Sequence, residues 1–406
     1  MTCRACGNAT DLVLDFGEQY LPDFIPPGTP RGPRFPLRAV LCGSCTLLQL
    51  DGTVPRDALY HERYGFRSGV NEAVRADLAS VVGYALGAVP QPGAWLDIAC
   101  NDGTLLGNVP RSVTRTGIDP LAQFADEALG RADRIVSDYF QPGYFEPGEF
   151  DVVTSVSMFY DLDDPGAFAR DVASVLAPGG AWVIQQNYSL DMIRLNAIDN
   201  FCHEHVTYFS VTSLMPVLAQ AGLEISDVTY SSVNGGCFRV LASHRGRRPE
   251  RGSVAAAVAA EAEAGLGDPL AWKQWGGDVL AELGKTRAFL EDAKVAGERV
   301  LLYGASTRGG TFLQMIGAGP GLLPYAVERS EAKVGTVMNA TGIPVISEEE
   351  MRRYPPDYLL ISPWFFREVF LEREKDYLAA GGSMIFPLPQ FEVVATGAAA
   401  VKGLPA

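Results

Sequence analysis

The strongest constraint on the fold is a strand, a glycine turn and a helical pattern that follow one another twice in this chain. The first copy is AWLDIACNDGTLLGN at 94–108, and the second is RVLLYGASTRGGTFLQMI at 299–316. After the first copy, apolar strand segments alternate with helical segments as far as PGGAWVIQQN at 178–187. Such alternation places parallel strands in a sheet between layers of helices. The sequence therefore predicts an α/β fold with two doubly wound units.

Two CxxC pairs, CRAC at 3–6 and CGSC at 42–45, precede the first unit. Each spacing lets two thiolates reach one tetrahedral Zn²⁺ at about 2.3 Å. A site with four sulfurs has no open coordination position, so its role should be structural. The pattern predicts a zinc site made by Cys3, Cys6, Cys42 and Cys45. Four free cysteines in a loop-rich segment are the alternative.

The length of 406 residues predicts more than one domain. We expect a zinc module at 1–70, a sheet domain at 71–245, and a helical connector with a second Rossmann-like domain at 246–406. The net charge is −15, and no basic run is longer than RGRR at 245–248, which argues against a nucleic-acid partner. The N-terminus does not resemble a secretory signal, and no apolar stretch approaches the ~20 residues that span a bilayer. These features predict a soluble cytoplasmic protein with a small-molecule substrate and no membrane partner.

The first glycine turn lacks the G-x-G-x-x-G pattern of a pyrophosphate-binding dehydrogenase, so a ligand without phosphates fits better. The next strand ends at Asp119, where an acidic residue can accept hydrogen bonds from ribose hydroxyls. Together, DIACNDG, GIDP, SDYF and LAPGGAWVI resemble the class I S-adenosylmethionine (SAM) methyltransferases. That resemblance implies that SAM is bound by the following residues of this chain: Asp97, Ala99, Asn101 and Gly103 in the first loop, Asp119 at the ribose, and Asp138 and Phe140 near adenine. Ala99 departs from the family pattern, in which Gly is usual.

The resemblance extends over nearly the whole chain. The paired CxxC motifs, the methyltransferase core, HEH at 203–205 and a second unit with YGAS at 303–306 are similar to the sugar C-methyltransferases, which modify nucleotide-linked keto-deoxysugars. The family implies methylation of an NDP-linked 4-keto-deoxysugar at C3, with a dTDP-linked sugar as one example, within antibiotic deoxysugar biosynthesis. It also implies a monomer or weak homodimer whose C-terminal domain helps to hold the sugar nucleotide. O- or N-methylation of a nucleotide sugar or secondary metabolite is the alternative.

Methylation of carbon requires a base, because the carbon beside a ketone becomes nucleophilic only after it loses a proton. Histidine suits this step, with an unperturbed pKa near 6.5. The resemblance favours His205 as the base, with Glu204 orienting the imidazole or contacting the substrate, and the sequence leaves open which of the two carries the proton. Cys202 stands where the family has a tyrosine. A second metal at HEH is the competing interpretation, but it would need a third ligand.

Further candidates lie in three loops. Tyr64 and Tyr160 are candidate catalytic residues, and Arg239, which follows the glycine pair of VNGGCFRV, is a candidate substrate contact. In the second unit, the helix that follows YGAS would open toward a ligand. Hydroxyl groups at Ser306 and Thr307, with charge from Arg308 and Lys333, could then hold a sugar-linked diphosphate.

Overall fold

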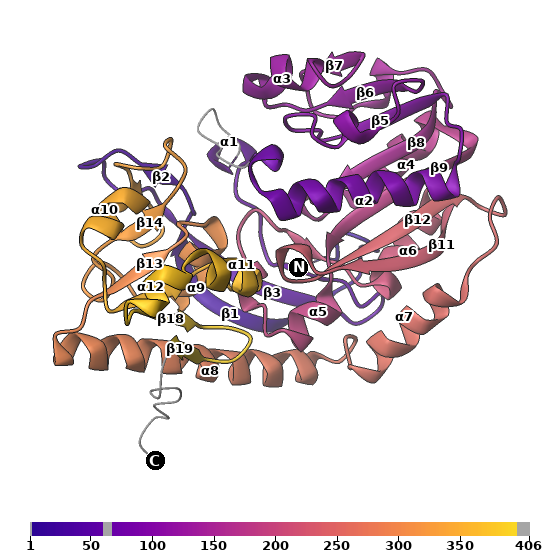
Figure 1. Cartoon of the computed structure of the whole chain (residues 1–406). Coiled ribbons are helices and arrows are strands. Elements are labelled where there is room, and N and C mark those ends of the chain that lie inside the picture. Colours follow the sequence, from indigo (N-terminus) through magenta and orange to yellow (C-terminus); the bar gives the residue numbers. More distant parts are fainter. Residues whose placement is uncertain (1, 60–66, 396–406) are drawn as a thin grey trace. The chain divides into compact units, whose positions relative to one another are not determined.

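The computed structural model describes residues 2–59 and 67–395 (Figure 1). Contacts between residues divide the chain into two units. The first unit comprises residues 1–12, 39–191 and 205–269, and the second comprises residues 13–38, 192–204 and 270–406. The three domain boundaries expected from the sequence stay a prediction, and each unit is described by itself below.

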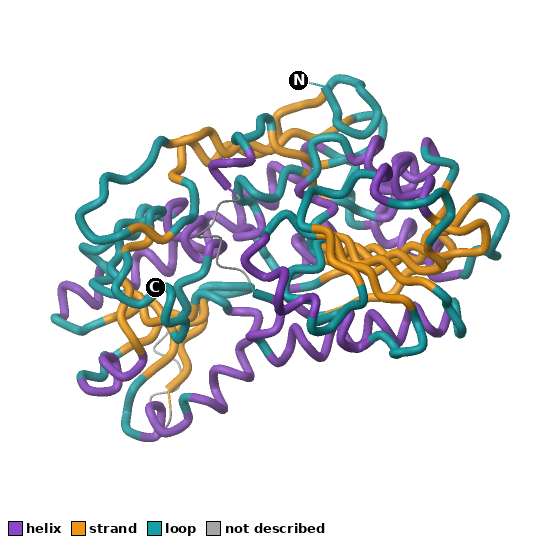
Figure 2. Tube along the Cα trace, turned by 90° about the horizontal axis from the view of Figure 1, so that it is seen from above, coloured by secondary structure: helices purple, strands orange, loops and turns teal. Residues whose placement is uncertain are grey.

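A seven-stranded sheet forms the centre of the first unit, in the order β11-β12-β9-β8-β5-β6-β7. Only β12 runs against its neighbours, because it pairs antiparallel with both β9 and β11. The chain leaves β5 in one direction to build β6 and β7, and in the other direction to build β8 and β9. Figure 2 shows these strands stacked side by side, with helices on both faces. The strands are β5 (Ala94–Ile98), β6 (Thr114–Ile118), β7 (Arg134–Val136), β8 (Phe150–Val156), β9 (Leu176–Asn187), β11 (Leu223–Ser231) and β12 (Cys237–His244).

The helices of the first unit cover this sheet. Helix α2 begins after Asn71, whose side chain accepts a hydrogen bond from the Ala73 N–H, and it buries Leu78 and Val82 against Trp95 of β5. Each large apolar side chain buried in this way contributes about 1.5–3 kcal/mol. These helices are α2 (Glu72–Ala88), α3 (Ala125–Leu129), α4 (Pro165–Val175), α6 (Val211–Gln220) and α7 (Gly252–Glu263).

One local expectation was wrong. The segment after Gly103 does not form an α-helix but a single 3₁₀ turn, Leu106–Asn108. Gly107 lies inside this turn and Pro110 follows it, and both residues disfavour a continuing helix. Gly103 itself has φ +75°, and a Cβ atom there would lie 2.8 Å from the Ala128 Cα. Only glycine fits this turn, which the sequence did predict.

A four-stranded sheet in the order β1-β3-β4-β10 carries the second cysteine pair, and its strand β4 pairs antiparallel with both β3 and β10. Its strands are β1 (Thr10–Tyr20), β3 (Arg34–Cys42), β4 (Leu48–Leu50) and β10 (Thr207–Tyr208). Strands β1 and β3 each have residues in both units, whereas β4 and β10 lie in the first unit. The short helix α1 (Arg56–Leu59) follows β4, and α5 (Ser189–Arg194) follows β9.

The second unit contains a six-stranded sheet in the order β16-β14-β13-β17-β18-β19, which is the strand order 3-2-1-4-5-6 of a Rossmann fold. All pairs are parallel except β18 with β19. The strands are β13 (Val300–Tyr303), β14 (Ala326–Glu328), β16 (Val345–Ser347), β17 (Tyr358–Ile361), β18 (Ser383–Phe386) and β19 (Glu392–Ala395). A separate pair joins β2 (Phe24–Ile25) to β15 (Val337–Met338).

The helices of the second unit include the long α8 (Pro269–Ala296), which starts at the last residue of the first unit and accounts for most of the expected helical connector. The others are α9 (Thr307–Met315), α10 (Glu348–Arg353), α11 (Arg367–Arg373) and α12 (Lys375–Ala379). Both doubly wound units and the small cysteine-bearing sheet agree with the predicted fold class. In the parts of the chain that the structure describes, no helix combines the length and the apolar character needed to cross a membrane.

Candidate active site and metal centre

The four cysteines of the paired CxxC motifs converge in the first unit. All four sulfur atoms lie within 4.8 Å of one another, with 3.4 Å from Cys3 Sγ to Cys45 Sγ and 3.5 Å from Cys6 Sγ to Cys42 Sγ. A tetrahedron with Zn–S bonds of about 2.3 Å has edges of about 3.8 Å, so the cluster fits one zinc ion. Backbone and side-chain donors already face the sulfurs, since the Ala5 N–H contacts Cys3 Sγ at 3.4 Å. These four residues would hold a closed, structural zinc ion.

A buried glutamine ties the first cysteine pair to strand β4. Gln49 accepts a hydrogen bond from the Arg4 N–H at 2.8 Å, and its Nε2 donates to the Thr2 carbonyl at 3.3 Å. Gln49 also stands opposite Thr207 in the pairing of β4 with β10. The main chain extends this link, because the Leu50 N–H donates to the carbonyl of Val206 at 2.9 Å. Cys42, the last residue of β3, and the strand that follows His205 therefore belong to one small sheet, which the sequence did not suggest.

The loop after β5 has an unusual backbone. Ala99 has φ 58° and Asn101 has φ 50°, in the left-handed region that non-glycine residues rarely adopt. The Asn101 N–H donates to the Asp119 carboxylate at 2.8 Å, and the Leu121 N–H donates to the same carboxylate at 2.8 Å. Asp119 thus joins the ends of β5 and β6. The pKa of Asp119 is raised by burial.

Asp97 lies at the end of β5 and is buried. Its carboxylate accepts a hydrogen bond from Thr154 Oγ1 at 2.7 Å. Burial raises the pKa of Asp97 to about 7, against the lowering effect of this hydrogen bond, and the nearby Asp119 charge raises it further. A carboxyl group whose pKa is raised this far by burial is typical of a functional site.

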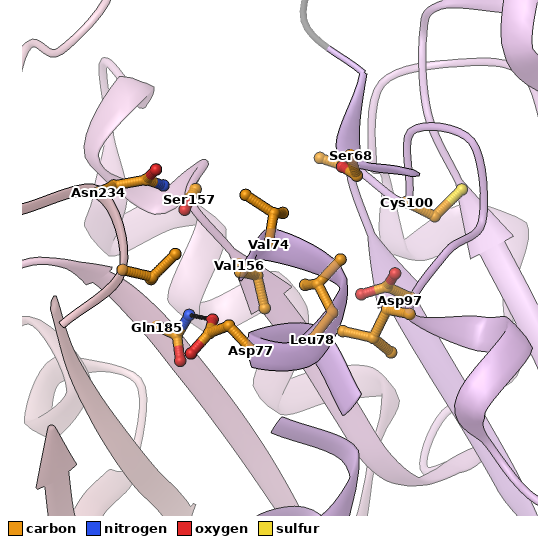
Figure 3. A pocket seen from close by; sticks show the side chains of 13 residues that line it. Ser68, Val74, Asp77, Leu78, Asp97, Cys100, Val156, Ser157, Gln185 and Asn234 are labelled. Carbon is orange, nitrogen blue, oxygen red and sulfur yellow. Dashed lines mark hydrogen bonds between the residues drawn. The ribbon is translucent and has the colours of Figure 1, made fainter. Parts of the chain in front are cut away.

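A pocket opens at the carboxyl edge of the sheet, where the strand order reverses between β5 and β8 (Figure 3). This is the place where doubly wound sheets bind ligands. The lining residues come from α2, the β5 loop, the ends of β8 and β9, and the β11–β12 loop. They are Ser68, Val74, Asp77, Leu78, Asp97, Ala99, Cys100, Leu105, Val156, Ser157, Gln185, Val233 and Asn234.

Backbone strain concentrates around this pocket. In the described part of the chain, six residues other than glycine have positive φ, and three of them line the pocket: Ala99, Ser157 and Asn234. Each costs of order 1–3 kcal/mol, and such residues cluster at binding and catalytic sites. The strain supports a functional role for the pocket, independently of any resemblance.

Only part of the predicted cofactor set lines the pocket. Asp97 and Ala99 do, and Asn101 and Asp119 are joined to each other beside them. Asp138 lies beyond β7, where its carboxylate accepts hydrogen bonds from the Tyr139 N–H and from the Tyr144 hydroxyl. Phe140 packs on Phe145 and Phe168, with ring centroids 6.1 and 5.3 Å apart. The adenine contacts of Asp138 and Phe140 stay a prediction.

The sequence interpretation missed Asp102. This buried residue accepts a hydrogen bond from the Gly69 N–H at 2.9 Å, while Asn101 Oδ1 accepts one from the Ser68 N–H at 3.0 Å. A Cβ atom on Gly69 would lie 2.6 Å from Asp102 Oδ2, so only glycine fits here. The segment that enters α2 is therefore held against the β5 loop. The only local sequence feature that indicated such a role was the pair Asn101–Asp102 in ACNDG.

The candidate base lies close to the sheet edge that carries the pocket. The His205 ring lies against the Tyr160 ring, with centroids 4.3 Å apart, and Thr207 Oγ1 donates to the Tyr160 carbonyl at 3.0 Å. Tyr160 follows the pocket residue Ser157 by three positions, which limits their separation to about 10 Å. The structure therefore brings together two predicted catalytic residues, His205 and Tyr160. Neither is itself part of the pocket lining.

The other residues of the HEH segment behave differently. Burial raises the pKa of Glu204 to about 7, and the charge of Asp23 contributes in the same direction. His203 is buried, with Nε2 3.3 Å from the Phe35 carbonyl, and burial lowers its pKa. A structural role fits His203. Tyr64 lies outside the described residues.

Arg239, a candidate substrate contact, does not line the pocket. It is buried beneath it, where its Nε donates to Gln185 Oε1 at 2.7 Å and its Nη2 lies 3.4 Å from Asp77 Oδ1. Gln185 Nε2 in turn donates to Asp77, and the Ser231 hydroxyl donates to Asp77 at 2.6 Å. These residues come from α2, β9, β11 and β12. We call Asp77, Gln185, Ser231 and Arg239 the pocket-floor network.

In the second unit, the turn before α9 has the predicted form. Ser306 Oγ accepts a hydrogen bond from the Gly309 N–H at 2.9 Å and thereby caps the helix. The two expected cations already have protein partners. Arg308 pairs with the buried Asp199 at 2.9 Å, and Lys333 donates to the Ala305 carbonyl at 3.0 Å. Binding of a diphosphate at this turn stays a prediction.

Three family models match successive parts of the chain. They describe a zinc binding domain at residues 3–60, a methyltransferase domain at 70–228 and a C-methyltransferase C-terminal domain at 232–389. The C-methyltransferase NovU of Streptomyces niveus is 26% identical to the chain over an alignment of 413 positions, which covers 97% of this chain and 96% of the relative.

Solved methyltransferase structures match less than half of this chain, with low scores. Magnesium protoporphyrin IX methyltransferase (ChlM) from Synechocystis PCC 6803, with bound S-adenosylhomocysteine (SAH), has a TM-score of 0.35 and 15% identity, covering 42% of this chain and 84% of its own. The N-methyltransferase NodS from Bradyrhizobium japonicum WM9 has a TM-score of 0.35 and 16% identity, covering 47% and 95%. At these scores the likeness carries no information about the reaction.

Proposed function

Since this chain belongs to the SAM-dependent C-methyltransferases, with the zinc binding, methyltransferase and C-terminal domains of that family, we propose that it methylates carbon C3 of an NDP-linked 4-keto-deoxysugar. The observation that carries the proposal is the packing of His205 on Tyr160, next to the sheet edge that holds the pocket. An imidazole at this place suits removal of a proton from carbon, a step that O- and N-methylation do not require.

The pocket is the proposed SAM site. Asp97 and the β5 loop lie at the end of the sheet where the family resemblance places the methionine and ribose parts, and the Asp119 carboxylate stands at the end of the next strand. When bound, SAM supplies the methyl group as an electrophile on a positively charged sulfur. The apolar side chains of Val74, Leu78 and Leu105 exclude water from part of the pocket.

His205 is the proposed base. It takes the proton from the carbon beside the ketone, so that the electron pair of the C–H bond forms an enolate, and the new carbon–carbon bond then forms from that enolate. The Tyr160 ring restricts the imidazole, because the two rings are in contact. The Tyr160 main chain is itself held by Thr207, two residues after His205. A ring confined in this way keeps its nitrogen in a productive position.

Glu204 is the competing base. With a pKa raised to about 7, its carboxyl group exchanges protons near neutral pH, as a general base should. Substitution distinguishes between His205 and Glu204 as the base. If His205 is the base, His205→Ala should slow proton removal far more than Glu204→Gln does. The reverse result would assign the base to Glu204.

The proposal of a nucleotide-sugar substrate is based on the fold of the second unit. Its strand order is that of Rossmann folds that bind nucleotides, and helix α9 presents its N-terminus at the carboxyl end of β13. The relative NovU is named as a C-methyltransferase, which supports carbon as the acceptor atom. The sugar, the base of the nucleotide and the C3 position are part of the proposal.

The test is exchange of solvent deuterium into an NDP-4-keto-deoxysugar without SAM, followed by mass spectrometry. The proposed enzyme should incorporate deuterium at the carbon beside the ketone, and His205→Ala should reduce the rate by about 10²–10⁴-fold. The control is His244→Ala, because His244 Nε2 lies 3.1 Å from the Leu176 carbonyl, at the far end of β12. Methylation of such a sugar without any exchange would instead indicate O- or N-methylation.

A further inference from the structure

The charge of the pocket lining is one-sided. Thirteen residues line the pocket, and two of them, Asp77 and Asp97, carry carboxyl groups (Figure 3). None of these thirteen described residues is Lys, Arg or His. A concave surface with carboxylates and no cation favours a positively charged ligand, because the low-dielectric walls strengthen each charge.

One cation lies just behind this lining. The Arg239 guanidinium reaches Asp77 Oδ1 at 3.4 Å and is held by Gln185 Oε1 and by Ser80 Oγ at 2.9 Å. It partly offsets the Asp77 charge without lining the pocket itself. Asp77 also accepts hydrogen bonds from Gln185 Nε2 and from the Ser231 hydroxyl. The pocket-floor network is thus a pair of opposite charges, with the negative one nearer the ligand.

Methyl transfer removes one charge from the cofactor. The bond from sulfur to the methyl carbon breaks, its electron pair stays on sulfur, and the positively charged sulfonium of SAM becomes the neutral thioether of SAH. The ammonium, carboxylate, ribose and adenine groups are the same in both molecules. The ratio of the two dissociation constants therefore isolates how the site treats the sulfonium charge.

We propose that Asp77 makes the pocket prefer the cationic SAM over the neutral product SAH, and that Arg239 limits the size of this preference. The inference rests on the proposed placement of SAM in this pocket. Its consequence is functional, because weaker binding of SAH lets the product leave and be replaced by SAM. The network thereby tunes product inhibition, beyond holding the β9 and β12 strands together.

The test measures SAM and SAH dissociation constants by isothermal titration calorimetry for variants that change the network charge in opposite directions. Asp77→Asn leaves Arg239 uncompensated and should lower the preference for SAM by roughly five- to thirtyfold, because the pocket lining loses one negative charge. Arg239→Gln leaves Asp77 uncompensated and should raise the preference by a similar factor. The double variant should return toward the wild-type ratio.

Arg239→Lys is the matched control. It keeps the charge but loses the planar contact with Gln185, so the ratio should stay within about twofold of wild type even if both affinities fall. A purely structural role would weaken SAM and SAH equally in every variant and leave the ratio constant, which would overturn the inference. If Arg239→Gln does not fold, Asp77→Asn against Arg239→Lys decides the question alone.

Failure of the proposed site is distinguishable from failure of this inference. If wild-type protein binds both molecules but Asp97→Asn and Asp77→Asn change neither affinity, the cofactor lies elsewhere and both proposals are wrong. If Asp97→Asn weakens binding while Asp77→Asn leaves the SAM-to-SAH ratio unchanged, only the role of Asp77 is wrong. Neither measurement requires a sugar substrate, so the identity of the sugar does not enter the result.

Discussion

Replacing Gln49 by leucine should loosen the zinc site, although Gln49 is not a ligand. The side chain is fully buried and joins the Arg4 N–H and the Thr2 carbonyl, on either side of Cys3, to strand β4. Leucine has a similar volume but can neither accept nor donate a hydrogen bond. Gln49→Leu therefore leaves one backbone donor and one backbone acceptor without their partner, next to the first cysteine pair.

The magnitude follows from the burial of these two groups. Thr2 is exposed, so its carbonyl can bond to water instead, whereas loss of the acceptor of the partly buried Arg4 N–H should cost the docked form of the first cysteine pair about 1–3 kcal/mol. Because zinc binding and folding of such a module are coupled, the loss should appear as weaker zinc affinity. At about 1.4 kcal/mol for each factor of ten, even the lower limit corresponds to about fivefold.

The assay is competition for zinc with a chromophoric chelator, followed by deuterium exchange on the keto-sugar. We expect Gln49→Leu to lose zinc at a lower chelator concentration than wild type. Gln274→Leu is the control, because Gln274 is exposed on α8 and bonds only to Asp278 in the described structure. Unchanged zinc affinity in Gln49→Leu would refute the argument that Gln49 docks the first cysteine pair.

Zinc removal from wild type adds a second readout. Strand β10 pairs with β4, and β10 lies two residues after His205, so loss of the metal should disturb the base. Deuterium exchange should therefore fall, whereas SAH binding, which depends on the seven-stranded sheet, should change less. Equal loss of both activities would indicate general unfolding instead.

Three further results are expected. Asp97→Asn should gain thermal stability relative to wild type as pH rises from about 4 to about 7. In wild type, the buried Asp97 carboxyl keeps its proton in the folded state up to a pKa of about 7, whereas the unfolded chain loses that proton near pH 4, so rising pH destabilises wild type alone. A difference in melting temperature that does not depend on pH would contradict this. Ala99→Gly should stabilise the protein by about 0.5 kcal/mol. A φ of 58° costs alanine about 1–2 kcal/mol, and the greater conformational entropy of glycine in the unfolded chain cancels part of the gain from removing that cost. A decrease of more than about 1 kcal/mol in the free energy of unfolding, measured with denaturant, would exclude this. Glu261→Gln should lower stability by about 2–5 kcal/mol in the same assay, because the buried Glu261 accepts from the Tyr188 hydroxyl and from the first N–H groups of α6, whereas the exposed Glu263→Gln should change it by less than about 0.5 kcal/mol.

The local features of the fold were predictable because each depends on residues that are close together in the sequence. The spacing of each CxxC pair is enough to bring two sulfurs together, and a strand followed by a turn with an obligate glycine, Gly103, is sufficient to predict a doubly wound sheet. The positions of Asp97 and Asp119 near the ends of their strands were predictable for the same reason, because an acid at the end of a parallel strand faces the ligand edge. Their contacts with SAM stay a prediction. The 3₁₀ turn at Leu106–Asn108 shows the limit of this reasoning, since one glycine and one proline ended the expected helix.

The residues that hold the site were not predictable. Gln49 acts on residues 45 and 47 positions earlier, Arg239 meets Gln185 from 54 positions away, and Tyr160 meets His205 across 45 positions. Neither a sequence motif nor the hydrophobic periodicity predicts such contacts. They exist only because sheet pairing brings distant strands into register.

The chain by itself therefore determined its chemical components: a four-sulfur metal set, two strand–turn–helix units and a histidine pair after the first of them. The tertiary structure decided how the components are used. It buried His203 and left His205 against Tyr160, and it placed Arg239 under the pocket instead of in it. The physical reason is that short-range sterics and hydrogen bonding set local structure, whereas burial and charge compensation depend on which distant segments meet.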